Sequence, residues 1–433
     1  MPASDRTRSG RRGSLVDLRP LTESPAFARL FAGRAVAGIG GQLTITAVGL
    51  NVYALSRSTF AVALTGVIAL VPTILAGLYG GMIADAFDRR LVALGSAVLS
   101  WASTLALAAL SWAGLQTVVS LYLLSAATAV ASTVLMATQS AIQPRLLGIR
   151  LLPAAAALGG ISTGVTVTVG PALAGVLIAS VGFQWCYTID AVLFVAALAG
   201  VLTLPPLPPE GVVDRPGLAS LASGVRFLRS APNVRMSFLV DIVAMTFGNP
   251  RVLLPAAAEL ILGGGAVTVG ILSAATAVGV LLSSVFSGRL GAVRWQGVAI
   301  ERSIQVYGFC IVGFGVVLLV AGLGAQGQLN VPAVVAAAVL LAGSGAADNV
   351  SSIFRSTVLQ AAAPDSVRGR LQGVFVVVVT GGPRLGDLYV GLLASTTLLW
   401  LPPALGGLLV VVLVALLARR SGFRAYDALD PKP

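Results

Sequence analysis

Long apolar stretches, interrupted by short polar turns, make up most of the chain. A helix needs roughly 20 mainly apolar residues to cross the hydrocarbon core of a bilayer. On that criterion we predict twelve membrane-spanning helices. They cover about 27–54, 60–84, 91–113, 116–138, 153–181 and 184–204 in the first half, and about 234–261, 266–288, 297–323, 331–357, 371–396 and 399–418 in the second.

The length of these stretches excludes two other interpretations. A membrane β-barrel would show segments of about ten residues with alternating polarity, whereas the apolar runs here are long and unbroken. The first stretch is also too long for a cleaved signal peptide, and it follows the polar or basic residues 1–26. The fold class predicted from the pattern is therefore an all-α polytopic membrane protein.

Composition supports a membrane protein and narrows the chemistry. Of 433 residues, 57% are apolar and 10% are charged, while soluble domains carry about 25% charged residues. The absence of histidine excludes Ser-His-Asp catalysis and His-ligated metal sites. Cys186 and Cys310 lie far apart, so they form no Cys-x-x-Cys site. We expect no enzyme activity, no bound metal and no cofactor.

The basic residues alternate between the two sides of the predicted membrane. They occur in the N-terminal arm, in every second loop and in the C-terminal tail, whereas only Arg57 lies on the other side. The loop residues are Arg89, Arg90, Arg145, Arg150, Arg215 to Arg235, Arg289, Arg294, Arg368 and Arg370. Because cytoplasmic loops are rich in arginine and lysine, both termini are predicted to be cytoplasmic. The net charge of +12 is thus explained by topology, and no nucleic-acid partner is expected.

A proline-rich stretch divides the chain into halves of six spans each. We predict a basic arm over 1–26, a first half over 27–204, a linker over 205–232, a second half over 233–418 and a tail over 419–433. The linker begins with Pro205-Pro206-Leu207-Pro208-Pro209 and ends in a short amphipathic pattern. Such halves are typical of transporters that contain parallel repeats. Gly170-Pro171 in span five and Gly382-Pro383 in span eleven support a repeat.

The turn after the second span carries the most specific motif. Its residues Gly81, Asp85, Arg89 and Arg90 are spaced as Gly-x-x-x-Asp-x-x-x-Arg-Arg. The string resembles the loop motif of the major facilitator superfamily, although Ala86 and Asp88 depart from the commonest form. The resemblance implies the major facilitator fold, with this motif acting in the conformational switch.

A second string, in span five, is similar to the antiporter motif of the same superfamily. Gly170, Pro171 and Gly175 match it, while Thr166 and Ala174 replace glycines. Pro171 removes a helix hydrogen bond and permits a kink, and the small residues allow a neighbouring helix to approach. In the superfamily this motif is associated with export by exchange.

A narrower resemblance covers most of the twelve spans. The string Arg251-Val252-Leu253-Leu254-Pro255-Ala256-Ala257-Ala258-Glu259, Thr357-Val358-Leu359-Gln360 and Gly386-Asp387 look like the bacterial enterobactin exporter and its macrolide- and drug-exporting relatives. Members of that family carry unrelated cargoes, so the resemblance implies an exporter and leaves the substrate open.

We single out seven ionisable residues within the predicted spans, where burial is costly and usually functional. They are Arg34, Asp241, Arg251, Asp348, Arg355, Arg384 and Asp387. Asp348 and Arg355 are seven residues apart on one helix face. Arg384 and Asp387 are spaced i, i+3, so they are close enough to pair. Either such pairs are permanent links that fix helix register, or a carboxylate exchanges its arginine partner for a proton.

We assign Asp387, Asp348 and Asp241 as proton-coupling candidates, because without histidine a carboxylate is the best available proton carrier. Arg34, Arg251, Arg355 and Arg384 are candidates for the substrate cavity. Their excess over the carboxylates favours an anionic or zwitterionic cargo, such as a catecholate siderophore. Asn249, Gln139, Gln143 and Asn349 are further polar candidates for the cavity wall.

Together these features predict a monomeric transporter in the bacterial inner membrane that exports a bulky amphipathic small molecule in exchange for protons. An importer or facilitator of a small metabolite, and an uncoupled scramblase or sensor, would share the architecture. A membrane enzyme lacks its expected polar cluster in this sequence. A nucleotide-driven pump lacks the Gly-x-x-x-x-Gly-Lys-Ser/Thr loop.

Overall fold

The computed structural model describes residues 17–148, 151–208, 226–285, 293–324, 328–362, 365–396, 398–420 and 422–428. After the short helix α1 (Arg19–Glu23), six long helices follow: α2 (Pro25–Ser56), α3 (Thr59–Ala86), α4 (Arg89–Trp112), α5 (Val118–Leu147), α6 (Leu152–Val181) and α7 (Phe183–Leu202). The second series is α9 (Pro232–Gly248), α11 (Gly265–Val285), α12 (Gln296–Gly322), α13 (Val331–Ala362), α14 (Asp365–Thr396) and α15 (Leu401–Arg420).

The described residues thus contain the twelve long helices that the sequence predicts. Eleven of them, counting α9 with its continuation, are long and apolar enough to cross a membrane. The exception is α14, whose middle carries Arg384 and Asp387. The linker residues 209–225 and the arm residues 1–16 lie outside the described part.

The seventh span is broken rather than continuous. Helix α9 ends at Gly248, and Asn249-Pro250 leads into the 3-10 turn η2 (Arg251–Leu253), α10 (Leu254–Ala257) and the π-helical turn η3 (Ala258–Leu262). Proline lacks a backbone N–H and disfavours helical backbone at the preceding residue, so Pro250 ends the regular helix. The Asn249 side chain accepts a hydrogen bond from the backbone N–H of Arg251 at 3.3 Å.

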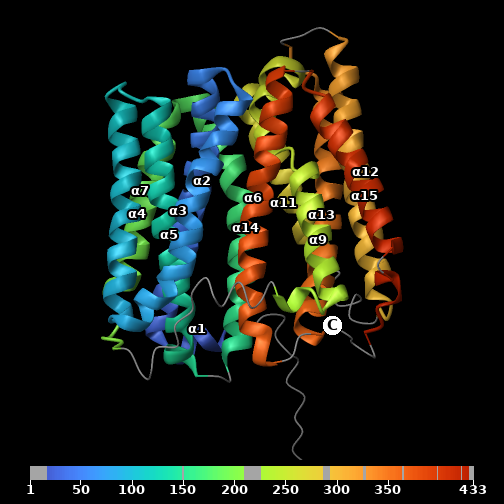
Figure 1. Cartoon of the computed structure of the whole chain (residues 1–433). Helices are drawn as coiled ribbons and strands as arrows, with labels where there is room; N and C mark the ends of the chain where they lie inside the picture. Colours follow the sequence, from blue (N-terminus) through green and yellow to red (C-terminus); the bar gives the residue numbers. More distant parts are fainter. Residues whose placement is uncertain are drawn as a thin grey trace, which may run out of the picture.

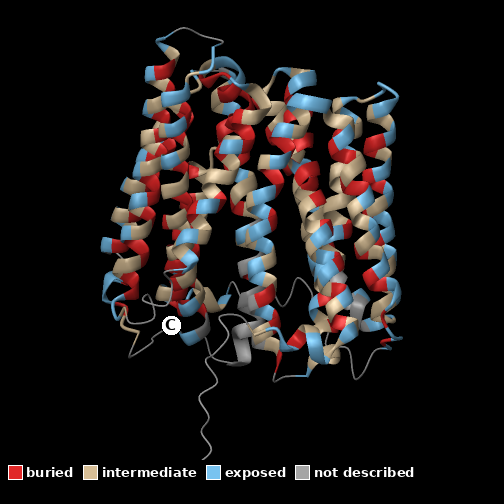
Figure 2. Ribbon diagram, turned by 180° about the vertical axis from the view of Figure 1, so that it is seen from behind, coloured by how far each residue is buried: buried red, intermediate tan, exposed pale blue. Residues whose placement is uncertain are grey.

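The helices pack as two groups that meet along a central seam (Figure 1). In the first group α2 packs on α6 and α7, and α5 packs on α3 and α4. In the second, α13 packs on α11 and α12, and α9 and α12 pack on α15. The groups meet where α6 lies against α11 and α3 lies against α14. Figure 2 shows exposed positions along the outer helix faces, many of them apolar, as expected for surfaces that contact lipid.

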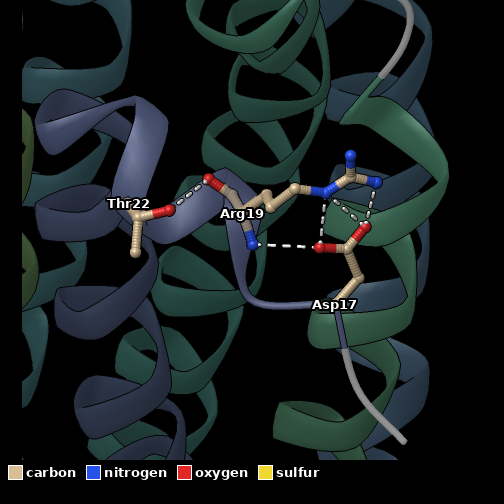
Figure 3. A network of polar contacts seen from close by, with 3 residues as sticks. All are labelled: Asp17, Arg19 and Thr22. Carbon is tan, nitrogen blue, oxygen red and sulfur yellow. Dashed lines mark hydrogen bonds and ion pairs between the residues drawn. The ribbon is translucent and has the colours of Figure 1, made fainter. Parts of the chain in front are cut away.

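Two faces of the molecule are named here. The terminal face is the one where α2 begins and α15 ends, and Figure 1 shows α1 on that face. The opposite face is the one where α2 ends and α3 begins. At the terminal face, Asp17 accepts hydrogen bonds from the backbone N–H and the guanidinium of Arg19, the closest at 2.6 Å (Figure 3). These bonds lower the pKa of Asp17 to about 2.

The chain's C-terminal residues 422–428 dock onto the start of α12. Phe423 in the 3-10 turn η5 (Phe423–Ala425) is buried, and its backbone lies against Gly297. Arg424 forms an ion pair with Glu301, whose side chain is 2% exposed, and Arg294 pairs with Asp427 at 2.7 Å. Residues 422–428 of the predicted tail are therefore folded against the second helix group and form part of it.

The docked tail predicts a specific loss of stability. Replacement of Arg424 by Met leaves the buried Glu301 carboxylate without its cation, which destabilises the folded state, although less than in a fully buried pair because the Arg424 side chain is 44% exposed. We expect a lower midpoint of thermal unfolding in detergent, with partial recovery in the Glu301→Gln, Arg424→Met double variant.

The matched control is Arg294→Met, which removes an exposed ion pair and should shift the midpoint less. An Arg424→Met midpoint equal to that of the unsubstituted protein would show that Glu301 is not held by this arginine.

Candidate functional site

A three-residue charge cluster lies inside the second helix group. Arg355 on α13 forms an ion pair with Asp241 on α9, and a second contact, of 3.4 Å, with Asp348, which lies about two turns away on the same face of α13. The side chains of Arg355 and Asp241 are each 7% exposed, whereas Asp348 is 30% exposed. Asp241 was predicted as a separate candidate, and the structure brings it into the Asp348–Arg355 pair.

The cluster leaves one carboxylate oxygen unsatisfied. Oδ2 of Asp241 is buried and has no hydrogen-bond partner among the described residues. Tyr307 of α12 is buried within electrostatic range of all three charges and packs against Gly248 at the end of α9. One guanidinium thus contacts two carboxylates, so the cluster carries one net negative charge when both are ionised.

A second cluster lies beside the break in the seventh span. Arg384 and Asp387 on α14 are in contact at 3.3 Å, as their i, i+3 spacing predicts. Arg251, in the turn that follows the break, lies within electrostatic range of both. Asp387 is 7% exposed, and its Oδ1 has no hydrogen-bond partner among the described residues. Two arginines therefore share one buried carboxylate, and the cluster has a net positive charge.

Arg384 also lies on the seam between the helix groups. A Cβ atom at Gly66 of α3 would collide with the Arg384 guanidinium, so the glycine makes room for this side chain. On the other side, Gly386 packs against the backbone of Met245 in α9. The charge pair on α14 is thus seated between the first helix group and the broken span, where a movement of either would disturb it.

Arg34 lies apart from both clusters, in the first helix group. It lines a pocket between α2, α5 and α6, together with Phe31, Gln139, Gln143 and Ser162. The four predicted cavity arginines therefore do not form one site: three belong to the second helix group and one to the first.

Sequence reasoning missed Asp190, a buried carboxylate of the first helix group. Asp190 on α7 is 2% exposed, and its Oδ2 accepts a hydrogen bond of 2.5 Å from the Thr44 hydroxyl. Gly40 of α2 provides the space, because a Cβ there would lie 2.9 Å from the Asp190 Cα. The signal was present, since a lone aspartate in an apolar span is the criterion that selected Asp241.

The motif after the second span ties the turn to its own helix group. Asp88 accepts hydrogen bonds from the backbone N–H groups of Arg90, at 2.8 Å, and Leu207, at 3.2 Å. Arg89 and Arg90 donate to carbonyl oxygens at the ends of α5 and α7. Asp88, one of the two residues that depart from the commonest motif, therefore caps the N-terminus of α4. The surroundings of Gly81 and the side chain of Asp85 lie outside the described part.

The glycines of the second motif mark close helix approaches. Helix α6 continues through Pro171, which lies inside it. Gly170 packs against Gln42 of α2, and a Cβ at Gly175 would lie 2.5 Å from the Ala266 carbonyl and 3.1 Å from the Cα of Gly270 on α11. The contact of Gly175 with α11 joins the two helix groups near the opposite face.

An ion pair spans the seam at the opposite face itself. Arg57, which ends α2 in the left-handed conformation (φ 52°), pairs with Glu259 in the π-helical turn η3. Both side chains are exposed. The sequence placed each of them near this side of the membrane, but it did not predict that they meet.

Comparison with known proteins identifies relatives along almost the whole chain. A family model described as transmembrane secretion effector matches residues 16–433. The enterobactin exporter of Salmonella paratyphi A is 26% identical over 382 residues, which cover 88% of each chain. That of Escherichia coli O1:K1 is 26% identical over 381 residues, which cover 87% of each chain.

Solved transporter structures share the fold. A bacterial homologue of the iron transporter ferroportin in an inward-facing state has a TM-score of 0.69 and 17% identity, covering 94% of this chain and 100% of its own. A POT family transporter in complex with 5-aminolevulinic acid has a TM-score of 0.73 and 12% identity, covering 92% and 96%. The predicted membrane transporter fold is confirmed.

The burial of the two clusters predicts a ranking of arginine substitutions. Arg355→Met strands two carboxylates and should destabilise the protein by about 3–5 kcal/mol. Arg384→Met strands only Asp387, which retains Arg251 nearby, and should cost less. Thermal unfolding of both variants in one detergent measures the order. If Arg384→Met lowers the midpoint as much as Arg355→Met does, the assignment of Arg355 as the shared counter-ion is wrong.

Proposed function

The chain belongs to the transmembrane secretion effector family of the major facilitator superfamily, and on that basis we propose that it is a proton-coupled exporter of a bulky amphipathic small molecule. Its similarity to enterobactin exporters over nearly the full length supports export and makes enterobactin the first cargo to test. The arginine pattern of the loops supports an inner-membrane protein with the terminal face in the cytoplasm.

The coupling proposal rests on the environment of Asp387. It is buried, one of its oxygens has no partner among the described residues, and its nearest counter-charge lies on the seam between the helix groups. A neighbouring guanidinium favours an ionised carboxylate, whereas a low-dielectric site without one favours the protonated form. Movement of Arg384 away from Asp387 would then favour proton uptake by the Asp387 carboxylate, and return of Arg384 would favour proton release.

Asp348 offers a second coupling position. It is the more exposed carboxylate of its cluster and makes the longer contact with Arg355. Because Arg355 is shared, protonation of Asp348 would leave the guanidinium to Asp241 alone without stranding a charge. Proton uptake at Asp348 could therefore be reversible at small structural cost.

Alternating access is supported by where the helix groups touch. Gly175 and Gly270, the Gly391 contact with Phe60, and the Arg57–Glu259 pair all lie toward the opposite face. These observations support a state closed at the opposite face, from which the groups would rock about a central site.

The coupling proposal is tested in proteoliposomes that contain a pH-sensitive dye. Addition of enterobactin under an imposed pH gradient should move protons through the unsubstituted protein. Asp387→Asn or Asp348→Asn should reduce this substrate-driven proton flux at least about tenfold, because a neutral amide cannot exchange a proton.

Asp427→Asn is the matched control, since that carboxylate belongs to the docked tail and should leave the flux unchanged. Proton-driven transport that survives undiminished in both single variants and in the double variant would refute coupling through these carboxylates.

The ion pair at the opposite face should bias the conformational equilibrium modestly. Exposed ion pairs contribute about 0.2–1 kcal/mol, so Glu259→Gln should shift the population toward opening of this face by at most about fivefold. Distance measurements between spin labels at Leu115 and Leu329, in a background with Cys186 and Cys310 replaced by Ala, report the shift. A Glu23→Gln variant at the terminal face should leave the distances unchanged, and an unchanged distribution in Glu259→Gln would show that the pair does not act as a latch.

A further inference from the structure

Arg34 differs from the other predicted intramembrane arginines in having no partner among the described residues. Arg355 and Arg384 form ion pairs, and Arg251 lies within range of Asp387. In the part of the chain that the structure describes, Arg34 has no ion pair and no hydrogen bond. The lack of a partner for a guanidinium within a predicted membrane span needs an explanation.

The position of Arg34 places it within the bilayer. Helix α2 is about 48 Å long at 1.5 Å per residue, and Arg34 lies about 14 Å from its first residue. A hydrocarbon core of about 30 Å centred on the helix would begin about 9 Å from that residue. Arg34 therefore lies at a depth about one helical turn inside the core, on the terminal side, and because the residue is exposed its guanidinium is open to water or to an incoming anion.

The pocket supplies hydrogen-bond donors beside the guanidinium. Gln139 and Gln143 are one turn apart on α5 and line the same pocket. Neither side chain has a hydrogen-bond partner among the described residues, although Gln139 is buried. Each amide offers two N–H donors and Arg34 offers five, while no carboxylate lines the pocket. This donor set matches an oxyanion rather than a cation.

The rest of the wall is aromatic and apolar. Phe27 and Phe31 of α2 line the pocket, and their stacked rings have centroids 6.0 Å apart. Leu30 and Ala155 add further apolar surface. An aromatic ring attached to the anion would lie against Phe31, since aromatic pairs at such distances are favourable.

We propose that this pocket binds the acid group of an organic anion whose adjoining part is an aromatic ring. The inference rests on the proposed export function and adds the chemical class of the substrate: the ligand carries a carboxylate or a comparable oxyanion. Its charge compensates Arg34 when the pocket is filled.

An anionic lipid headgroup offers the same chemistry from another source. The aromatic wall favours the soluble acid, because a lipid phosphate is attached to glycerol and flexible chains rather than to a ring. The two sources are separated by the lipid composition of the membrane used in the test.

The experiment measures binding without any proton gradient, so its result is independent of the coupling test. The full chain is placed in nanodiscs of phosphatidylcholine, and the fluorine NMR line of 4-(trifluoromethyl)benzoate is followed against that of 4-(trifluoromethyl)benzamide. Empty nanodiscs give the contribution of lipid partition. We expect the benzoate to bind at least about tenfold more tightly than the amide, because only the carboxylate carries a negative charge that can pair with the guanidinium.

Arg34→Met should lower the benzoate affinity about tenfold and leave the amide unchanged. Arg34→Lys should retain part of the affinity, which shows that the fold is intact. Arg294→Met, which removes the exposed pair with Asp427 in the docked tail, is the matched control and should change neither ligand. Equal benzoate binding in Arg34→Met and in the unsubstituted protein would overturn the proposal. So would Arg34-dependent binding that vanishes when phosphatidylglycerol replaces part of the phosphatidylcholine, since a lipid headgroup would then be the occupant.

Discussion

A charged side chain inside a bilayer must find an opposite charge, a set of hydrogen bonds or water, and this constraint orders the whole molecule. The second helix group meets it with ion pairs: one arginine for two carboxylates around Arg355, and two arginines for one around Asp387. The first group meets it differently. Asp190 is held by a hydroxyl, and Arg34 has no partner among the described residues. The two halves of the transporter are thus electrostatically unequal.

This electrostatic difference is consistent with separate roles for the two halves, one in proton coupling and one in substrate binding. Pairs that share a counter-ion can change protonation without exposing an isolated charge, which suits the second group to the proposed coupling. The Arg34 guanidinium, unpaired among the described residues and set in a pocket of amides and aromatic rings, suits the proposed binding site. The seam joins the two roles, because Arg384 is seated against Gly66 of the first group while it contacts Asp387 of the second. The proposed rocking of the groups would therefore act directly on the charge pair.

The sequence predicted what depends on local pattern. The spans, the spacing of Arg384 and Asp387, and the shared helix face of Asp348 and Arg355 all follow from periodicity. Contacts between distant segments could not be predicted in this way: nothing in the chain links Asp241 with Arg355, Arg57 with Glu259, or Glu301 with Arg424. Such pairs depend on which helix faces pack together. Apolar spans with weak amphipathic patterns do not allow the packed face to be predicted from the sequence.

The central claim is that a carboxylate of the second helix group changes its protonation state during transport. Infrared difference spectroscopy of the reconstituted protein measures this most directly, through the carbonyl stretch of a protonated carboxyl group when enterobactin is added at constant pH. The account predicts a carboxyl band that changes on substrate addition and disappears from the difference spectrum in Asp387→Asn or Asp348→Asn. A difference spectrum without such a band, or one that is identical in both variants, would contradict it.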